Sequence, residues 1–555
     1  MVPDTDLDAL LARADAWVAE DPDPHTADQL RELTAKVSAG DAAALHELND
    51  AFAGTLEFGT AGLRGRLGPG SNRMNRVVVM RAAAGLASYV RANGGDSIVI
   101  GYDARHNSNV FAHDTARVMR GAGVSAMVLP RPLPTPVLAF AIRHLGAAAG
   151  VMVTASHNPA QDNGYKVYLG DGRQIVSPTD RDIAERISQV GALSLIPLGD
   201  DFVTLDDSVL AAYIERAVSL LPPGPRDVTA VSTAMHGVGG DVLCRVVIEA
   251  GFPAPVTVAA QQQPDPLFPT VTFPNPEEPG AIDLALAQAR ITRPDIVIAN
   301  DPDADRCAAA VPHQRDWRML TGDEIGWLLG WWTIQRQRRL GQEPHGALAQ
   351  SIVSGAMLHA IASDAGIDYA ATLTGFKWVS RVPDLIFGYE EALGYCVDPS
   401  VVSDKDGITA ALVLLELAAH MKSQGRTLQD VLDDLARLHG VYLTSQVSER
   451  VTDLAQIGDA MSRLRAHPPT SLAGLHVQRF DDLEEGSEDL PATDGLRFVL
   501  DGARVIVRPS GTEPKLKCYL QVVMSVTDDL VSSRDEAAQI MHRLRADISR
   551  ALNLS

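Results

Sequence analysis

Three loops of this sequence contain side chains suited to moving a phosphoryl group. The first is Thr154–Pro159, in which Ser156 follows an apolar run and His157 stands beside it. A serine hydroxyl is a poor nucleophile unless a base or a metal activates it. Lys166 lies ten residues further on, and Asn163–Gly164 indicates a tight turn that would fold Lys166 back toward the serine. By itself, a Ser-His pair in a loop is usually a turn or a helix cap, so its meaning depends on the other loops.

The second loop contains three aspartates at alternate positions, Asp301, Asp303 and Asp305. Alternate residues of an extended backbone project to the same side, and three like charges placed together favour a bound cation. Ligation by oxygen alone suits Mg²⁺, which typically keeps few protein ligands plus a phosphate oxygen. A calcium loop would need Gly at its sixth position and Glu at its twelfth, and both are missing. A solvated acidic loop is the remaining alternative, although Arg306 could bind a phosphate with two hydrogen bonds.

The third loop, residues 508–517, combines basic and hydroxyl side chains with a glycine. Such a loop can hold a phosphate through charge, hydroxyls and backbone N–H groups, although a surface turn is the alternative. Two weaker signals are the glycine-bounded segment Gly388–Gly394, with its two glutamates, and Lys405 in a sequence typical of surface turns. The first could accept hydrogen bonds from sugar hydroxyls.

The elements around these loops indicate an α/β fold. From about residue 77 to 315 the chain alternates helical stretches with continuous apolar runs at 97–103, 150–154 and 295–299. Continuous apolar runs predict strands buried on both faces, with much parallel pairing. In such folds ligands collect at the carboxyl ends of the strands. Two of the three runs lead directly into the serine and aspartate loops.

The two ends of the chain differ from this pattern. Residues 1–50 look helical, with a capping box at Thr26–Gln29 followed by Leu30, Leu33 and Val37 at helical spacing. We expect them to form a structural extension without chemistry. Near the other end, residues 496–500 and 503–507 predict a β-hairpin with a type I′ turn at Asp501–Gly502, and a helix is expected from about 534 to 552.

Composition limits the possible functions. At 555 residues the chain should form several domains. Its net charge of −22, from 48 basic and 70 acidic residues, argues against binding nucleic acid or an anionic membrane. The sequence has no apolar run of ~18 residues, no secretory leader pattern, and four scattered cysteines. These features predict a cytoplasmic protein, and an anionic substrate would need positive charge concentrated at its site.

Six motifs in order resemble the α-D-phosphohexomutase superfamily of phosphoglucomutases and phosphomannomutases. They are Gly59–Gly65, the serine loop, the aspartate loop, Thr374–Trp378, Gly388–Gly394 and the loop at 508–517, spanning about residues 55 to 525. The residues of the aspartate and glutamate loops are most similar to those of the branch with the second mammalian phosphoglucomutase/phosphopentomutase and related bacterial mutases.

The resemblance implies a four-domain α/β architecture around a central cleft, with three related α/β domains and a smaller C-terminal α+β domain. The expected boundaries are a helical extension at 1–50, the serine-loop domain at 51–205, the metal-loop domain at 206–315, the sugar-loop domain at 316–430 and the phosphate-loop domain at 431–555.

The resemblance also implies roles for individual residues. Ser156 would be a phosphoserine, and its phosphate would join the metal ligands Asp301, Asp303 and Asp305 around Mg²⁺. The other expected catalytic residues are Lys166, Arg64, Lys405 and His157, of which the two lysines and the arginine are better candidates for charge and proton work than the histidine. The expected substrate-binding residues are Thr60, Arg306, Gly375, Phe376, Lys377, Glu390, Arg508, Ser510, Gly511, Thr512 and Lys517.

The reaction implied by the resemblance is exchange of hexose 1-phosphate and hexose 6-phosphate, with glucose as the leading sugar, through a bisphosphorylated sugar that also serves as activator. Mannose and pentose phosphates are alternatives, because Glu390-Glu391-Ala392 replaces the Glu-x-Ser of many members. Pro302 and Ala304 replace glycines without removing a carboxylate. A metal-dependent sugar phosphatase and a catalytically silent sugar-phosphate sensor are the competing functions. The enzyme is expected to act as a monomer or dimer.

Overall fold

The chain divides into two compact units. The computed structural model describes residues 7–59, 62–451, 455–486, 490–509, 515–527 and 529–552. Unit 1 consists of Met1–Arg318 and Asp398–Glu416, and unit 2 of Met319–Val397 and Leu417–Ser555. Each unit is built from sheets covered by helices, as an α/β sequence predicts.

Unit 1 begins with three helices, α1 (Leu7–Glu20), α2 (Pro24–Ser38) and α3 (Ala42–Ala51). The predicted capping box at Thr26–Gln29 is wrong, because α2 starts earlier, with Asp23 as its N-cap accepting from the amide of His25. Thr26 lies inside the first turn. The predicted buried face is confirmed by Leu30 and Val37, which pack into the core of the first sheet's helices.

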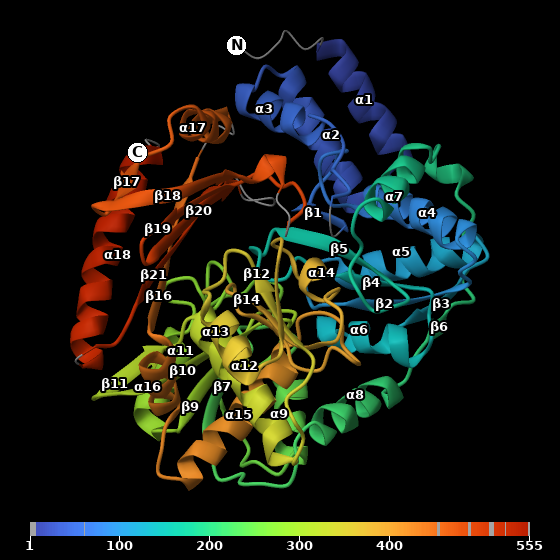
Figure 1. The fold of residues 1–555 in the computed structure, drawn as a ribbon. Helices are drawn as coiled ribbons and strands as arrows, with labels where there is room; N and C mark the ends of the chain where they lie inside the picture. The colour runs from blue at the N-terminus through green and yellow to red at the C-terminus, as the bar shows by residue number, and fades with distance from the viewer. Residues whose placement is uncertain are drawn as a thin grey trace. The chain divides into compact units, whose positions relative to one another are not determined.

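The first sheet of unit 1 has the strand order β1-β5-β4-β2-β3-β6. Strands β4, β2, β3 and the edge strand β6 run parallel, as predicted, whereas β5 runs antiparallel to both β4 and β1. Helices α4, α5 and α7 cover one face and α6 lies on the other (Figure 1). The bounds are β1 Gly62–Arg66, α4 Arg76–Ala92, β2 Ser97–Tyr102, α5 Ser108–Gly121, β3 Ser125–Val128, α6 Thr135–His144, β4 Ala149–Val153, β5 Asp162–Leu169, α7 Thr179–Ser188 and β6 Val203–Thr204.

The second sheet of unit 1 has the order β11-β10-β9-β7-β8, with β7, β8 and β9 parallel and β10 antiparallel to β9. The predicted strand at 295–299 is β9, which is fully buried, and it leads into the aspartate loop. The bounds are α8 Ser208–Ser219, β7 Ala230–Thr233, α9 Gly240–Glu249, β8 Val256–Thr257, α10 Ala259–Gln262, α11 Asp283–Thr292, β9 Ile296–Asn300, β10 Cys307–His313 and β11 Asp316–Met319.

Unit 2 contains a third sheet of order β13-β12-β14-β15, in which β12, β13 and β14 are parallel and β15 is antiparallel. The helix α15 begins in the part of the chain assigned to unit 1 and ends in unit 2. The bounds are α12 Gly322–Arg339, β12 Ala347–Ser351, α13 Met357–Ala365, β13 Asp368–Thr372, α14 Phe376–Val379, β14 Leu385–Glu390, β15 Gly394–Cys396, α15 Gly407–Ser423 and α16 Leu428–His439.

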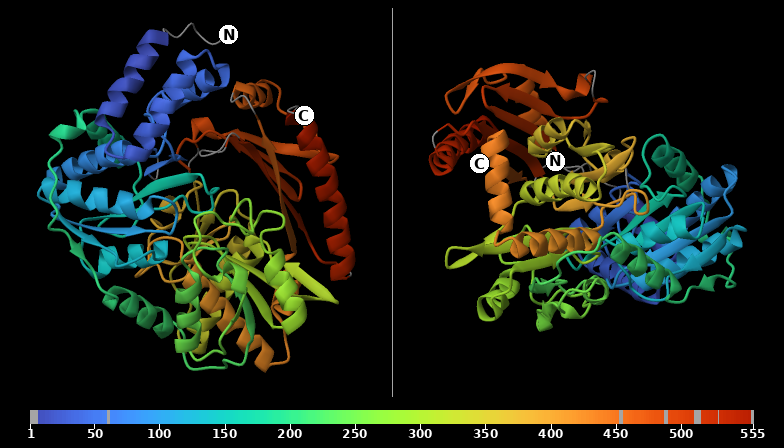
Figure 2. Two further views of the ribbon diagram at one scale, coloured as in Figure 1. Left: turned by 180° about the vertical axis from the view of Figure 1, so that it is seen from behind. Right: turned by 60° about the horizontal axis from the view of Figure 1, so that its bottom comes forward.

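The fourth sheet, also in unit 2, has the order β16-β21-β20-β19-β18-β17, and its six strands are paired antiparallel. The predicted hairpin is confirmed by β19 and β20, but only Gly502 of its turn has a positive φ, so the turn is not type I′. The predicted closing helix is α18, which runs along the sheet (Figure 2). The bounds are β16 Val441–Arg450, α17 Ala455–Ala466, β17 Ser471–Leu472, β18 Leu475–Asp482, β19 Leu496–Leu500, β20 Ala503–Pro509, β21 Lys515–Met524 and α18 Leu530–Leu552.

The first three sheets share one arrangement. In each, a buried strand with a parallel neighbour ends in a chemistry-bearing loop, and the chain then returns as an antiparallel strand: β4 to β5, β9 to β10, and β14 to β15. The loops therefore occupy the carboxyl edges of their sheets, where α/β folds bind ligands. Within the described part of the chain, no helix combines the length and apolarity needed to cross a bilayer.

Candidate active site

The Ser156 hydroxyl is buried and directed at the aspartate loop. Ser156 follows β4 by three residues, is 3% exposed, and adopts a left-handed backbone conformation with φ 52°. Its Oγ donates to Oδ2 of Asp301 at 2.9 Å and lies 3.3 Å from Nδ1 of His157. A positive φ at a residue with a side chain is unfavourable, so neighbouring contacts must hold this loop.

Arg105 supplies those contacts. Its Nη2 donates to the carbonyls of Ser156 and Asn158, each at 2.6 Å, and its Nη1 donates to the carbonyl of Pro159 at 2.7 Å. Asp103 pairs with the same guanidinium at 3.3 Å and accepts from the hydroxyl of Thr154, whose Oγ1 in turn accepts from the amide of Ser156. Sequence reasoning missed Arg105, because its partners are backbone carbonyls and these leave no pattern of side chains in the sequence.

The three aspartates form a compact buried cluster. One carboxylate oxygen from each of Asp301, Asp303 and Asp305 lies within 4.8 Å of the others. Oδ2 of Asp303 and Oδ2 of Asp305 accept hydrogen bonds from Lys166 at 2.8 and 2.9 Å. The Oδ1 atoms of both residues are buried and have no hydrogen-bond partner among the described residues. Buried carboxylate oxygens are normally paired or ligate a metal, so this cluster fits a divalent cation.

The backbone of the aspartate loop is shaped to bring the carboxylates together. Ala304 has φ 54°, and its amide donates to the carbonyl of Asp301 at 2.9 Å. Thr135, at the start of α6, donates its hydroxyl to Oδ2 of Asp303 at 2.6 Å and its amide to the carbonyl of the same residue at 2.9 Å. The amide of Arg306 donates to Asp301 Oδ1 at 3.0 Å. Thr135 is a second positioning residue that the sequence did not reveal.

Lys166 reaches the cluster, and Arg64 reaches the serine loop, from neighbouring strands. The predicted turn at Asn163–Gly164 is wrong, because both residues lie within β5. Lys166 is instead brought close because β5 runs antiparallel beside β4, with Lys166 opposite Met152. Arg64 on β1 stands opposite Gly164 of β5, and its Nη1 donates to Oδ1 of Asn158 at 3.3 Å.

Lys405 arrives from a segment a hundred residues further along the chain. Its Nζ donates to Oδ2 of Asp305 at 2.8 Å. The approach depends on Gly407, whose amide donates to the carbonyl of Ala304 at 3.1 Å and whose carbonyl accepts from Nδ2 of Asn300 at 3.2 Å. A Cβ at Gly407 would lie 2.2 Å from the carbonyl oxygen of Arg306. Only glycine fits this close backbone contact.

Burial and neighbouring charges shift the pKa values of the site's titratable groups in different directions. Burial and the neighbouring carboxylates of Asp303 and Asp305 raise the pKa of Asp301 well above its ordinary value. Burial alone would lower the pKa of Lys166, but Asp303 and Asp305 outweigh it and raise that pKa. Burial, helped by the cations Arg306 and Arg64, lowers the pKa of His157 well below its ordinary value. At neutral pH the lysine is therefore charged and the histidine neutral.

The glutamate motif lies in unit 2, at the carboxyl edge of the third sheet. Glu390 is the last residue of β14, and its Oε1 accepts from the amide of Gly375 at 2.7 Å. Gly375 has φ 109° and precedes α14, in which Phe376 and Lys377 are buried. The ammonium of Lys377 lies 5.8 Å from the ring centroid of Trp378. The structure thus groups four of the residues expected to bind substrate.

The phosphate-loop residues that the structure describes stand at the ends of two strands of unit 2. Arg508 on β20 is paired in register with Lys517 on β21, so two basic residues face each other across the ladder. Three predicted members of this loop, Ser510, Gly511 and Thr512, lie outside the described residues, as does Thr60 in the first motif. Arg306 is described, and its Nε lies 3.9 Å from both Asp301 and Asp305.

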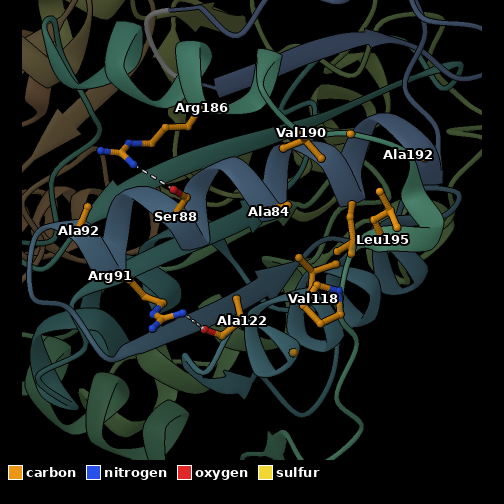
Figure 3. Close-up of a pocket in the computed structure, with 14 residues that line it drawn as sticks. Ala84, Ser88, Arg91, Ala92, Val118, Ala122, Arg186, Val190, Ala192 and Leu195 are labelled. Carbon is orange, nitrogen blue, oxygen red and sulfur yellow. Dashed lines mark hydrogen bonds between the residues drawn. The ribbon is translucent and has the colours of Figure 1, made fainter.

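A groove of about 670 Å³ elsewhere in unit 1 is a weaker candidate (Figure 3). Small and apolar residues of α4, α5 and the segment after α7 line most of it. Its two arginines are already hydrogen-bonded, Arg186 to the hydroxyl of Ser88 and Arg91 to the carbonyl of Ala122. The groove lies at the carboxyl ends of α4 and α5, which lead into the amino ends of β2 and β3, so it opens at the sheet edge opposite Ser156.

Four family profiles match this chain in succession. Those described as phosphoglucomutase/phosphomannomutase alpha/beta/alpha domains I, II and III match residues 55–193, 211–314 and 321–438. The profile described as phosphoglucomutase/phosphomannomutase, C-terminal domain, matches residues 447–528. The predicted four-domain architecture, with three α/β domains and a C-terminal domain, is confirmed by these matches.

Similar proteins carry the names of three phosphomutases: phosphomannomutase, phosphopentomutase and phosphoglucomutase. A probable phosphomannomutase of Haemophilus influenzae is 49% identical over 485 residues, covering 85% of this chain and 98% of that protein. The phosphopentomutase of Homo sapiens is 33% identical, covering 91% and 90%. Among solved structures, a putative phosphomannomutase from Thermus thermophilus superposes with a TM-score of 0.69 at 25% identity, covering 88% of this chain and 99% of that one.

Proposed function

Because this chain belongs to the phosphoglucomutase/phosphomannomutase family and is a phosphomutase of that type, we propose that it interconverts hexose 1-phosphate and hexose 6-phosphate through a phosphoserine at Ser156, with glucose as the preferred sugar. The observation that carries this proposal is the placement of a buried serine hydroxyl 2.9 Å from Asp301, within a cluster of three carboxylates and two lysines.

In the proposed reaction the phosphoryl group leaves Oγ of Ser156 and bonds to the free hydroxyl oxygen of the sugar phosphate. The product is a bisphosphorylated sugar, which turns around so that Ser156 can accept its other phosphoryl group. Each transfer breaks one P–O bond and forms another, so the barrier depends on positioning and on neutralising the phosphoryl oxygens. The same bisphosphorylated sugar would serve as the activator that loads an unphosphorylated serine.

We propose that Asp301, Asp303 and Asp305 would hold Mg²⁺ together with the phosphate of Ser156. The Oδ1 atoms of Asp303 and Asp305 are buried and accept no hydrogen bond from the residues that the structure describes, which supports a hard cation at this point. When bound, the ion would neutralise charge on the transferring phosphoryl group. Lys166, held protonated by two aspartates, would add positive charge beside it, and Lys405 would do the same from its contact with Asp305.

We assign two further roles around the reacting oxygen. Arg64, held near the serine loop by Asn158, would contact the transferring phosphate as a bidentate donor. His157 is neutral and 3.3 Å from the serine oxygen, so its Nδ1 can accept the proton that Oγ carries when unphosphorylated.

Separate groups of residues would recognise separate parts of the substrate. We propose that Thr60 and Arg306 contact the phosphate near Ser156, that Gly375, Phe376, Lys377 and Glu390 contact the sugar, and that the non-reacting phosphate binds at 508–517. The last group comprises Arg508, Ser510, Gly511, Thr512 and Lys517. We also propose domain boundaries at 50/51, 205/206, 315/316 and 430/431.

The direct test of this mechanism replaces Ser156 with alanine. We expect Ser156→Ala to lose mutase turnover and to lose the species about 80 Da heavier that phosphorylation of the wild type adds. The control is Ser188→Ala, which removes an exposed hydroxyl on α7 that donates to a neighbouring carbonyl. Turnover at the wild-type rate in Ser156→Ala would refute the phosphoserine mechanism.

The preferred sugar requires a second experiment. Relatives of this chain carry the names phosphomannomutase, phosphopentomutase and phosphoglucomutase, so mannose and pentose phosphates are the alternatives to glucose. We expect the highest kcat/KM with glucose 1-phosphate in a panel that includes mannose and ribose 1-phosphates, with Mg²⁺ and a bisphosphate activator. Free phosphate as the main product would instead indicate a sugar phosphatase.

A further inference from the structure

The segment Ser351–Ala356, which begins at the last residue of β12, carries a group of buried polar contacts within unit 2. Ser351 and Ser354 are fully buried, and the hydroxyls of both donate to Oε2 of Glu391, at 3.0 and 2.9 Å. The amide of Glu391 donates back to the hydroxyl of Ser354 at 3.1 Å. These contacts fix one carboxylate oxygen of Glu391.

The other oxygen of Glu391 is available to a ligand. The residue itself is only partly buried, and no described residue hydrogen-bonds its Oε1. Glu391 lies in the turn directly after β14, at the carboxyl edge of the third sheet. A carboxylate with one oxygen immobilised and the other open is a rigid acceptor for a hydroxyl group.

The same segment is also attached to the fourth sheet. Nη2 of Arg504 on β20 donates to the carbonyl of Ser354 at 2.7 Å, and Oε1 of Gln521 on β21 accepts from the amide of Ala356 at 2.7 Å. Ile352 and Val353, which lie between these polar contacts, pack with Ile506 and Tyr519 of the same two strands. The segment is thus held at both its polar and its apolar positions.

Strand register connects these contacts to the phosphate loop. Across β20 and β21, Arg504 pairs with Gln521, Ile506 with Tyr519, and Arg508 with Lys517. Alternate residues of a strand share a face, so the three pairs lie on one face of the ladder. The first two pairs bind Ser351–Ala356, and the third is the basic pair at the phosphate loop, about 13 Å from Arg504 along the strand.

We propose that Ser351–Ala356 positions Glu391 relative to the strands that carry the Arg508–Lys517 pair, and that Glu391 accepts a hydrogen bond from a hydroxyl of the sugar whose non-reacting phosphate is bound at that pair. Glu391 is then a specificity residue that compensates for the hydroxyl missing at Ala392. Arg504 is a positioning residue that acts through Ser354. This assignment rests on the proposed mutase function.

The test is a double-mutant cycle between Arg504→Met and Glu391→Gln, with KM and kcat measured for glucose, mannose and ribose 1-phosphates. We expect each single variant to raise KM for the preferred sugar about tenfold, and the double variant to raise it no further, because both act on one contact. Arg497→Met is the matched control, since Arg497 lies on the adjacent strand β19 and pairs with Asp481 rather than with the segment.

Each other outcome has a definite meaning. An additive, about hundredfold, increase in the double variant would show that Arg504 does not act through Glu391. If Arg504→Met does not fold, Ser354→Ala replaces it in the cycle, with an expected increase of about threefold. Unchanged KM in Glu391→Gln, with normal wild-type turnover, would overturn this inference alone, whereas a wild type without turnover on every sugar would overturn the proposed function.

Discussion

Removing the Arg105 guanidinium tests whether its hydrogen bonds hold the backbone of the serine loop in place. Arg105 and Asp103 are each 1% exposed, and the arginine satisfies carbonyls of Ser156, Asn158 and Pro159. Arg105→Met would leave these carbonyls without their donor and the buried Asp103 carboxylate without its counter-ion. Breaking a buried ion pair by removing one partner costs about 3–5 kcal/mol, much of it from the uncompensated charge.

The cost should be concentrated in the serine loop, so it is best measured locally. A chain of several domains does not unfold in two states, and a single free energy of unfolding would not be meaningful. Hydrogen exchange of amides within 154–164 reports local opening instead. A loss of about 3 kcal/mol corresponds to exchange about 150-fold faster. We expect phosphorylation of Ser156 by a sugar bisphosphate to slow in parallel.

The control for this experiment is Arg117→Met. Arg117 pairs with Asp200 on the surface of the same domain, where the acid is 79% exposed, and exposed pairs contribute little. Exchange of the serine loop in Arg105→Met at the rate seen in this control, together with normal Ser156 phosphorylation, would refute the positioning role of Arg105.

Three further predictions follow from other features of the two units. Mg²⁺ at 100 times its Kd should stabilise the domain that holds the aspartate loop by about 2.7 kcal/mol, and the melting transition of this domain should lose that shift in Asp305→Asn; an equal shift in both proteins would place the ion elsewhere. Gly407→Ala should lose most Mg²⁺ response and activity, because its Cβ would meet the Arg306 carbonyl at 2.2 Å, whereas Gly458→Ala, with open space around it, should keep both. Burial raises the pKa of Asp323 from 3.8 to about 6, so the folded state binds its proton more tightly than the unfolded state. The domain that contains Asp323 should therefore gain about 1 kcal/mol of stability between pH 7 and pH 5 in the wild type relative to Asp323→Asn, and equal pH dependence of this domain's melting transition in the two proteins would contradict the shift.

The strands and loops of the site could be predicted from sequence because their signals are local. Continuous apolar runs located β2, β4 and β9, and the serine and aspartate loops follow two of them directly. Since parallel strands place their carboxyl ends at one edge, a polar loop after a buried strand is expected to carry ligands. The position of Lys166 was also expected near Ser156, although the predicted turn was the wrong means of bringing it there.

The supporting residues could not be predicted, because their partners are backbone atoms or lie far away in the chain. Arg105 binds carbonyls, which every residue possesses, and Thr135 reaches an aspartate 168 positions away. Arg504 binds the carbonyl of Ser354 across 150 positions. Helix α2 was expected in this region, but it starts at Pro24, two residues before the expected cap Thr26. The reason is that the carboxylate of Asp23, rather than the hydroxyl of Thr26, accepts a hydrogen bond from the first amides of the helix.

The return of Asp398–Glu416 to unit 1 has a consequence for protein synthesis. A ribosome releases the chain from its N-terminus, and domains fold as their residues emerge. When Arg318 has emerged, unit 1 possesses its two sheets and the aspartate loop, but it still lacks the segment that supplies Lys405 and the Gly407 contact with Ala304. Until about 400 residues have been made, the nascent carboxylate cluster has Lys166 and Arg306 beside it but still lacks Lys405. The charge balance of the site is therefore completed late, only after most of the sugar-loop domain has already left the ribosome.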